Sequence, residues 1–277
     1  MPRVDAHLHV WRAATGPTPG VSTLVPPQQD VPLAAAAAML AQHRVDRAVL
    51  VQPVFRGEDN CYIADCVRAS PDCYAGVCVV DPRVPGAGKR LAFWAGQGFR
   101  GVRLRPRLPD EEKIFGDAAS FPLWAAAAQH SIAVSILSGP EHLPTIAALA
   151  ERFAEVPIVI DHLGHPDPAA GATSAPFRQL LNLASHPRVF VKLSGFYHFS
   201  RKAFPFPDCW DLIRAVYEHF GPRRLLWGSD YPHVTLNCGY ARSQEVLDLA
   251  LADWSAGDRA AVLGGTALEL YWPSASI

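Results

Sequence analysis

The sequence predicts a (β/α)8 TIM barrel, and three observations lead to that prediction. The chain has 277 residues, a length at which an α/β barrel folds as one domain. Short β-branched runs alternate with longer Ala- and Leu-rich stretches, the pattern of βαβ units around a parallel sheet. Eight such runs occur, enough to close a barrel, whereas an open doubly wound sheet usually has about five to seven strands. We therefore expect a single domain over residues 1–277.

Each predicted strand is a short run dominated by Val, Ile, Leu or aromatic residues and bounded by turn-forming residues. In chain order these strands are Arg3–Val10, Arg47–Val54, Tyr74–Asp81, Gly101–Arg105, Ile132–Leu137, Pro157–His162, Val189–Ser194 and Leu225–Asp230.

The predicted helices lie between these strands, where Ala and Leu recur at helical spacing. They are Leu33–His43, Cys61–Ala69, Lys89–Gln97, Pro122–Gln129, Leu143–Phe153, Phe177–Ala184, Asp211–Phe220 and Gln244–Ala252, with a further C-terminal helix near Asp258–Tyr271. A dinucleotide-binding fold is not expected, because no G-x-G-x-x-G follows the first strand.

The charge balance excludes several classes of partner. With 25 basic and 26 acidic residues the formal net charge is −1, so no global field attracts nucleic acid or an anionic membrane. No apolar run approaches the ~18 residues of a membrane span, and the N-terminus lacks the layout of a signal peptide. We expect a cytoplasmic protein acting on a small molecule, and the sequence leaves open whether it forms a homo-oligomer. Its six cysteines contain no C-x-x-C pair and are predicted to be unpaired thiols.

The first strand carries the motif Asp5-Ala6-His7-Leu8-His9. Because side chains alternate along a strand, we expect Asp5, His7 and His9 to share one face, with Leu8 and Val10 on the other. Two imidazoles at this spacing can hold one metal ion. By itself an H-x-H motif is weak evidence for a metal site, because surface and core histidines also occur at this spacing. Its position at the end of a strand strengthens the metal-site interpretation.

Two later strands also end in ionisable residues. Asp161 and His162 directly follow an apolar run, and Asp230 ends the eighth strand. An aspartate here can bind metal or take a proton from an attacking water molecule, although Asp230 could equally form the turn before Tyr231. We interpret Asp161 as a loop or helix-capping carboxylate. His7, His9, His162 and Asp230 all fall at the carboxyl ends of strands, the face on which barrel enzymes carry their active sites.

Basic residues suggest how a substrate is held. Arg103 and Arg105 share one face of the fourth strand, and two guanidinium groups suit a substrate carboxylate. The alternative is a pair of arginines bridging to acidic rim residues, namely Asp110, Glu111 or Glu112. Lys192 and Ser194 share one face of the seventh strand, but the sequence does not fix whether that face is interior, so we rank them lower. The loop histidines His165, His198 and His233 could each reach a substrate, although histidines in loops are usually solvated.

Five segments together resemble the amidohydrolase superfamily, and more closely its amidohydrolase-related (amidohydrolase 2) branch, which includes 2-pyrone-4,6-dicarboxylate lactonase and sugar-lactone hydrolases. They are Val4–Trp11, Gly101–Leu104, Ile160–Gly164, Val191–Gly195 and Trp227–Pro232. The resemblance implies a (β/α)8 barrel that hydrolyses a lactone or a similar cyclic ester, with His7, His9, His162 and Asp230 as catalytic residues and metal ligands.

The chain also departs from the pattern of the superfamily. Two-metal members place a carboxylated lysine on a middle strand, where this chain has Ser135-Ile136-Leu137-Ser138. A two-metal centre is therefore not expected. Two alternatives stay open: one bound divalent metal ion such as Zn2+, or metal-independent catalysis with the histidines acting directly.

The sequence thus predicts a hydrolase that opens a small carboxylated lactone. In this hypothesis Asp230 activates water, while His7, His9 and His162, or one metal ion that they bind, polarise the carbonyl. One alternative is a metal-dependent non-oxidative decarboxylase of an aromatic acid, although the first motif of those lyases usually begins with glutamate rather than Asp5. The other is a non-catalytic barrel that binds a small molecule.

Overall fold

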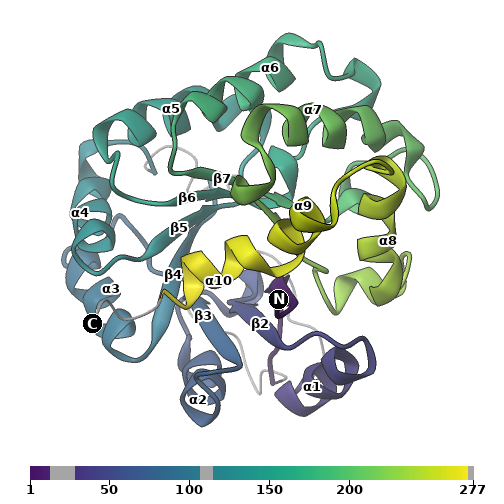
Figure 1. Cartoon of the computed structure of the whole chain (residues 1–277). Coiled ribbons are helices and arrows are strands. Elements are labelled where there is room, and N and C mark those ends of the chain that lie inside the picture. The colour runs from purple at the N-terminus through teal and green to yellow at the C-terminus, as the bar shows by residue number, and fades with distance from the viewer. Residues whose placement is uncertain (13–28, 107–114, 274–277) are drawn as a thin grey trace.

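The computed structural model describes residues 1–12, 29–106 and 115–273. Eight parallel strands form one sheet in the order β1 to β8 and curl into a barrel (Figure 1). Their bounds are Val4–Leu8, Arg47–Val51, Tyr74–Cys78, Phe99–Leu104, Ala133–Ile136, Ile158–Ile160, Val189–Leu193 and Leu225–Trp227. All eight lie within or next to the predicted runs, so the predicted barrel is confirmed.

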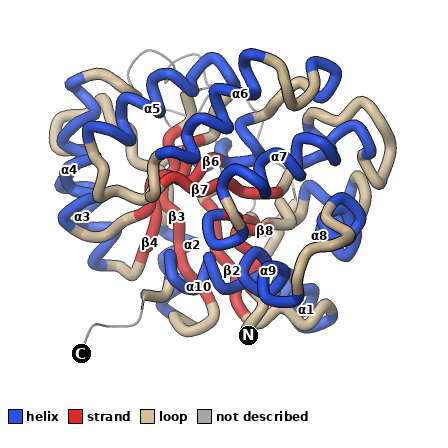
Figure 2. The backbone as a smooth tube through the Cα atoms, turned by 45° about the horizontal axis from the view of Figure 1, so that its top comes forward, coloured by secondary structure: helices blue, strands red, loops and turns tan. Residues whose placement is uncertain are grey.

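Helices surround the strands, as the tube in Figure 2 shows. Helices α1 to α8 span Leu33–Gln42, Cys61–Ala69, Ala87–Gly96, Phe121–Gln129, Leu143–Arg152, Ala175–Asn182, Trp210–Phe220 and Tyr240–Ala250. Each agrees with a predicted helix to within a few residues. None of the helices in the described part of the chain has the length and apolarity that a bilayer crossing requires. The six cysteines are unpaired, as expected.

The predicted C-terminal helix near Asp258–Tyr271 is divided into shorter pieces. Helix α9 spans Ala256–Ala260, a π-turn spans Ala261–Gly265, and α10 spans Thr266–Tyr271. A Cβ atom on Gly264 would lie 2.0 Å from the carbonyl oxygen of Pro2, so the chain can pass the N-terminus only with glycine here. This close contact has no signature in a helical periodicity, which is why the sequence predicted one continuous helix.

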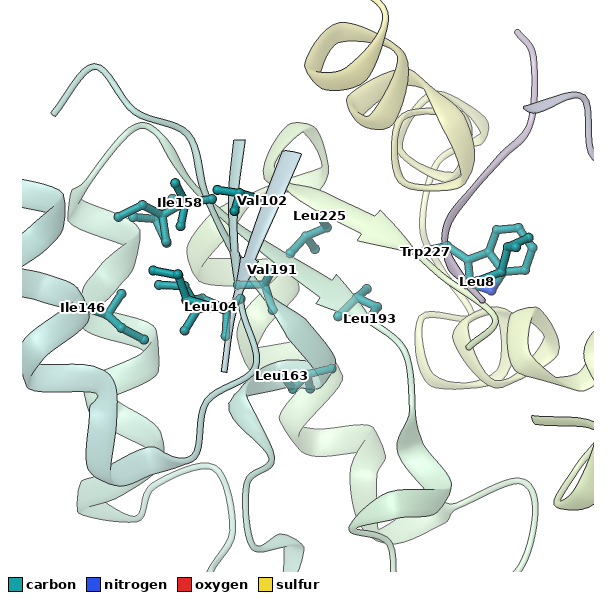
Figure 3. Close-up of a cluster of buried hydrophobic side chains, with 14 of the residues drawn as sticks. Leu8, Val102, Leu104, Ile146, Ile158, Leu163, Val191, Leu193, Leu225 and Trp227 are labelled. Carbon is teal, nitrogen blue, oxygen red and sulfur yellow. The ribbon is translucent and has the colours of Figure 1, made fainter. Parts of the chain in front are cut away.

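The apolar side chains form two layers. Strand residues that face outward pack against the helices, and Figure 3 draws part of this outer layer, with Ile146 of α5 near Leu104 and Ile158. Residues that face inward fill the barrel together with Ala267 and Tyr271 of α10. Figure 1 shows α10 in front of the strands, close to the N-terminus. The inner layer therefore seals one end of the barrel and leaves the other end for chemistry.

Strand β1 contains an irregularity that sets the direction of its side chains. Asp5 pairs with Ala48 and Leu8 pairs with Leu50, so three steps on β1 oppose two on β2. Such an extra residue shifts the alternation of side chains. The prediction that Asp5 shares a face with His7 and His9 is therefore wrong: Ala6 belongs to the inner layer and Leu8 to the outer one.

Candidate active site

Three predicted residues converge at the carboxyl ends of β1 and β8. The Nε2 atoms of His7 and His9 lie 3.3 Å apart, and Asp230 Oδ1 lies 3.6 Å from the first and 3.3 Å from the second. All three side chains are buried, and their potential ligand atoms lie within 4.8 Å of one another. Gly228 makes this possible, because a Cβ atom there would lie 2.6 Å from the Cβ atom of His7.

The protonation of His9 indicates that this group fits a metal ion. His9 Nδ1 lies 2.7 Å from the carbonyl oxygen of Val51 and must donate its proton to it. In the neutral ring the Nε2 atom therefore carries a lone pair, and this lone pair faces Asp230 Oδ1, which is also an acceptor. A cation between these atoms removes their repulsion, and a histidine held by a backbone carbonyl is the usual arrangement around a protein-bound metal. His7, His9 and Asp230 are thus suitable ligands for one ion.

The second oxygen of Asp230 is fixed by the loop that follows β7. Tyr197 donates its hydroxyl to Oδ2 at 2.5 Å, and His198 Nε2 lies 2.9 Å from the same oxygen. Burial alone would raise the pKa of Asp230, but the hydrogen bond from His198 is the largest of the opposing effects that hold it well below its usual value. Asp230 also has a left-handed backbone, with φ of 60°, a strained conformation that concentrates at functional sites. The carboxylate is therefore ionised, anchored on one oxygen and open on the other.

His162 lies beside this group but is not one of its three converging residues. Its ring centroid is 4.6 Å from that of His7, and its Nδ1 atom is 2.8 Å from the hydroxyl of Ser194. The backbone of His162 is left-handed, with φ of 50°. Burial lowers its pKa well below the usual value, so the ring is neutral. The role of His162 as a fourth ligand stays a prediction.

A buried ion cluster lies beneath the histidines. Asp161 Oδ2 accepts a hydrogen bond from Arg103 Nε at 2.8 Å, and its Oδ1 lies 3.0 Å from Lys192 Nζ. Asp161 and Lys192 are completely buried. Burial would raise the pKa of Asp161, but the charges of Lys192 and Arg103 hold it well below its usual value. The interpretation of Asp161 as a loop or capping carboxylate is therefore wrong.

His7 connects the ion cluster to the converging group. Its Nδ1 atom lies 3.2 Å from Lys192 Nζ and 3.5 Å from Asp161 Oδ1, while Nε2 points to His9 and Asp230. Burial lowers the pKa of His7 to about 3, and the charge of Lys192 adds to this effect. His7 is thus a neutral imidazole whose single proton can be on either nitrogen.

A pocket of about 360 Å³ opens above these residues. It is lined by His9, Val54, Arg103, Leu137, His162, His165, His198, Asp230 and His233. Three loop histidines interpreted as solvated are part of this wall. Arg103 is in the lining, but Arg105 is not: its Nη1 atom donates to the carbonyl oxygen of Val54 at 3.0 Å. The rim acids proposed as alternative partners for the arginines, Asp110, Glu111 and Glu112, lie outside the described residues.

Sequence reasoning missed the residues that support the site. Lys192 and Ser194 were noted as sharing a strand face, but the sequence did not show that this face points inward. Asp161 is adjacent to the predicted site residue His162, and Tyr197 and His198 follow the end of the seventh predicted strand, so their positions in the sequence were the available signal. A rule that every polar residue near a strand carboxyl end is a candidate would have found them, at the cost of many solvated loop residues.

Comparisons with known proteins identify the family of the chain. The family model described as Amidohydrolase matches residues 4–272. An L-fucono-1,5-lactonase from Burkholderia ambifaria is 35% identical over 238 residues, covering 83% of this chain and 80% of that protein. A 4-sulfomuconolactone hydrolase from Rhizobium radiobacter is 31% identical over 231 residues, covering 83% of this chain and 75% of that protein.

Solved structures show the same architecture. A crystal structure of an amidohydrolase from Burkholderia multivorans with bound zinc superimposes with a TM-score of 0.84 at 26% identity, covering 98% of this chain and 99% of that chain. A 5-carboxyvanillate decarboxylase from Sphingomonas paucimobilis superimposes with a TM-score of 0.65 at 17% identity, covering 88% of this chain and 84% of that chain. The second likeness is one of fold alone.

Proposed function

The chain belongs to the amidohydrolase family, and from that premise we propose that it is a hydrolase that opens a small carboxylated lactone. The observation that carries the proposal is the state of Asp230: one oxygen is anchored by Tyr197 and His198, and the other faces His7 and His9 beside the pocket. Relatives that are named as a lactonase and a lactone hydrolase support the same reaction type.

The charge of the pocket favours an anionic substrate. Arg103 and the histidines His165, His198 and His233 line it, and Asp230 is the one carboxylate among its lining residues. The Nε atom of Arg103 is occupied by Asp161, and among the described residues its two Nη atoms make no hydrogen bond. A guanidinium edge of this kind binds a carboxylate with two parallel hydrogen bonds. We therefore assign the substrate carboxylate to Arg103 rather than to Arg105.

Asp230 acts as the general base in the proposed reaction. Its Oδ1 atom removes a proton from a water molecule as the water oxygen bonds to the ring carbonyl carbon. The ring C–O bond then breaks, and Asp230 returns the proton to the departing ring oxygen, which gives a hydroxy acid. Tyr197 and His198 hold Oδ2, so the carboxylate does not rotate while Oδ1 exchanges the proton.

His162 is suited to stabilise the oxyanion. If Ser194 donates its hydroxyl proton to Nδ1, the proton of His162 lies on Nε2, and the ring is part of the pocket wall. A well-placed donor of this kind is typically worth about 3–4 kcal/mol in the transition state. His9 does not fill this role as a neutral ring, because its proton is committed to Val51.

We propose that His7, His9 and Asp230 hold one divalent metal ion, with zinc as the first candidate. The bound ion would supply Lewis-acid polarisation of the substrate carbonyl. Nitrogen ligands suit zinc, and the zinc-bound relative from Burkholderia multivorans supports this identity.

The proposal is tested with matched pairs of lactones that differ only in a ring carboxylate, with acid release followed by a pH indicator. We expect turnover of the carboxylated member and a loss of about 10²- to 10⁴-fold in Asp230→Asn, the range typical for removal of a general base. Asp211→Asn, an exposed aspartate on α7, is the control and should keep full activity.

Two results would contradict the proposal: turnover that survives in Asp230→Asn, or a preference for the neutral lactone of each pair. Release of CO2 from aromatic acids would instead support the decarboxylase alternative. That alternative is not favoured here, because the likeness to the decarboxylase extends only to the fold.

A further inference from the structure

We propose that Lys192 and Asp161 compete for the Nδ1 atom of His7 and thereby decide whether His7 is a metal ligand or a hydrogen-bond donor. In the metal-free protein Lys192 donates to Nδ1, and the ring proton stays on Nε2. Metal binding requires the proton to move to Nδ1, where Asp161 accepts it. The inference rests on the metal site proposed above.

The contacts of Nδ1 define the competition. A neutral imidazole carries one ring proton, so Nδ1 is either an acceptor or a donor. The Lys192 ammonium, which can only donate, lies 3.2 Å away, and Asp161 Oδ1, which can only accept, lies 3.5 Å away. Both partners are completely buried, so water does not take their place. The shorter contact favours Lys192.

The contacts of Nε2 agree with this assignment. In the neutral ring of His9, Nε2 is an acceptor, because the one ring proton is donated from Nδ1 to the carbonyl oxygen of Val51. His7 Nε2 lies 3.3 Å from that atom. Two lone pairs would repel each other at this distance, whereas an Nε2 proton on His7 gives a hydrogen bond. Lys192 on one side and His9 on the other therefore select the same tautomer.

The surroundings of His7 also suit the alternative tautomer, in which the ring proton is on Nδ1. Asp161 Oδ1 is buried and forms an ion pair with Lys192 Nζ at 3.0 Å, but it accepts no regular hydrogen bond among the described residues. Arg103 fixes the other oxygen of Asp161 at 2.8 Å. A proton on His7 Nδ1 would give Oδ1 a donor in addition to Lys192 and leave Nε2 free to bind a cation. Carboxylate partners of this kind orient the histidines of metal sites.

The tautomer can be observed without any substrate. Long-range 1H–15N correlation spectra of 15N-labelled protein distinguish Nδ1–H from Nε2–H, and the signals absent from His7→Gln identify His7. We expect Nε2–H in chelator-treated protein and Nδ1–H after zinc is added. Nδ1–H in the metal-free protein would overturn the inference, whether or not the protein hydrolyses lactones.

Lys192→Met gives a second measurement. The side chain is similar in size but cannot donate, so His7 should adopt Nδ1–H without metal. Zinc affinity, measured by competition with a chromogenic chelator, should rise by about 10- to 100-fold, the range in which groups that contact metal ligands act. The control is Lys89→Met, which removes an exposed lysine on α3 and should leave the affinity unchanged.

The zinc measurement separates this inference from the proposed function. An affinity in Lys192→Met within about threefold of the wild type would overturn the competition, even if lactone hydrolysis is established. If Lys192→Met does not fold, the spectra of the wild-type protein with and without zinc still decide the question. If hydrolysis fails but the tautomer changes as expected, only the proposed function is wrong.

Discussion

The carboxylate of Asp5 joins β1 to β8 by accepting two hydrogen bonds from Ser229, one from its backbone N–H at 2.9 Å and one from its hydroxyl at 2.5 Å. Tyr240 of α8 donates a third at 2.9 Å. Burial raises the pKa of Asp5 to about 6, although these donors oppose the shift. Asp5 lies two residues before His7, and Ser229 lies directly before Asp230. These hydrogen bonds therefore fix the relative position of the two segments that carry the converging residues.

Ser229→Ala removes the hydroxyl donor and leaves a buried carboxylate oxygen with one partner fewer. We expect a loss of about 1–3 kcal/mol in the free energy of unfolding, measured by urea denaturation. Ser185→Ala, at an exposed serine, should change it by less than about 0.5 kcal/mol. Equal stability of the two variants would show that Asp5 does not need the hydroxyl.

Tyr197→Phe removes one of the two groups that anchor Asp230. Hydrogen bonds to a charged group contribute about 1.5–3 kcal/mol, so we expect kcat to fall by about tenfold or more with KM little changed. Tyr217→Phe is a matched control, because Tyr217 donates to Asp258 far from the pocket, and it should keep its activity. A rise in KM alone would instead assign Tyr197 to substrate binding.

Gly195→Ala tests the position of His162. Gly195 has a φ of 64°, and an added Cβ atom would lie 2.6 Å from His162 Nδ1. Gly171→Ala is the matched control, since Gly171 has a φ of 75° but nothing within 4 Å of the added atom. Both variants should lose about 1 kcal/mol of stability from backbone strain. Only Gly195→Ala should lose kcat/KM, by at least about tenfold, and equal activity would contradict a catalytic position for His162.

Acid should destabilise the protein through its buried histidines. Burial lowers the pKa of His7 from 6.5 to about 3 and that of His233 to about 4. The unfolded chain therefore binds protons below pH 6.5 that the folded chain does not, so stability is present above that pH and is lost as the pH falls. Each such histidine should contribute a slope of up to about 1.4 kcal/mol per pH unit between pH 6 and 4.

His233→Gln should remove part of this slope, measured by urea denaturation at several pH values. His130→Gln, at an exposed histidine after α4, should not change it. Asp5 acts in the opposite direction, because its raised pKa favours the folded state at low pH between about 6 and 3.8. An unchanged slope in His233→Gln would indicate that its imidazole is protonated in the folded protein.

The sequence alone determined the barrel and the strand ends at which the three converging residues lie. Strand runs and helical stretches depend on local composition, and eight alternations leave few architectures other than a closed parallel barrel. The placement of His7, His9 and Asp230 at strand ends follows from the same reasoning, because parallel strands in a barrel end on one face. These features are local or topological and need no knowledge of side-chain contacts.

The tertiary structure decided which side chains meet. The irregularity in β1 separates Asp5 from His7, and the inward direction of β7 brings Lys192 to His7 from 185 residues away. The left-handed backbone of Asp230 turns its carboxylate toward residues of the β7 loop. Side-chain direction depends on register and backbone angles, and long-range pairs depend on the closure of the whole barrel. Neither is encoded in a local pattern, so the support around the candidate site became visible only in the folded chain.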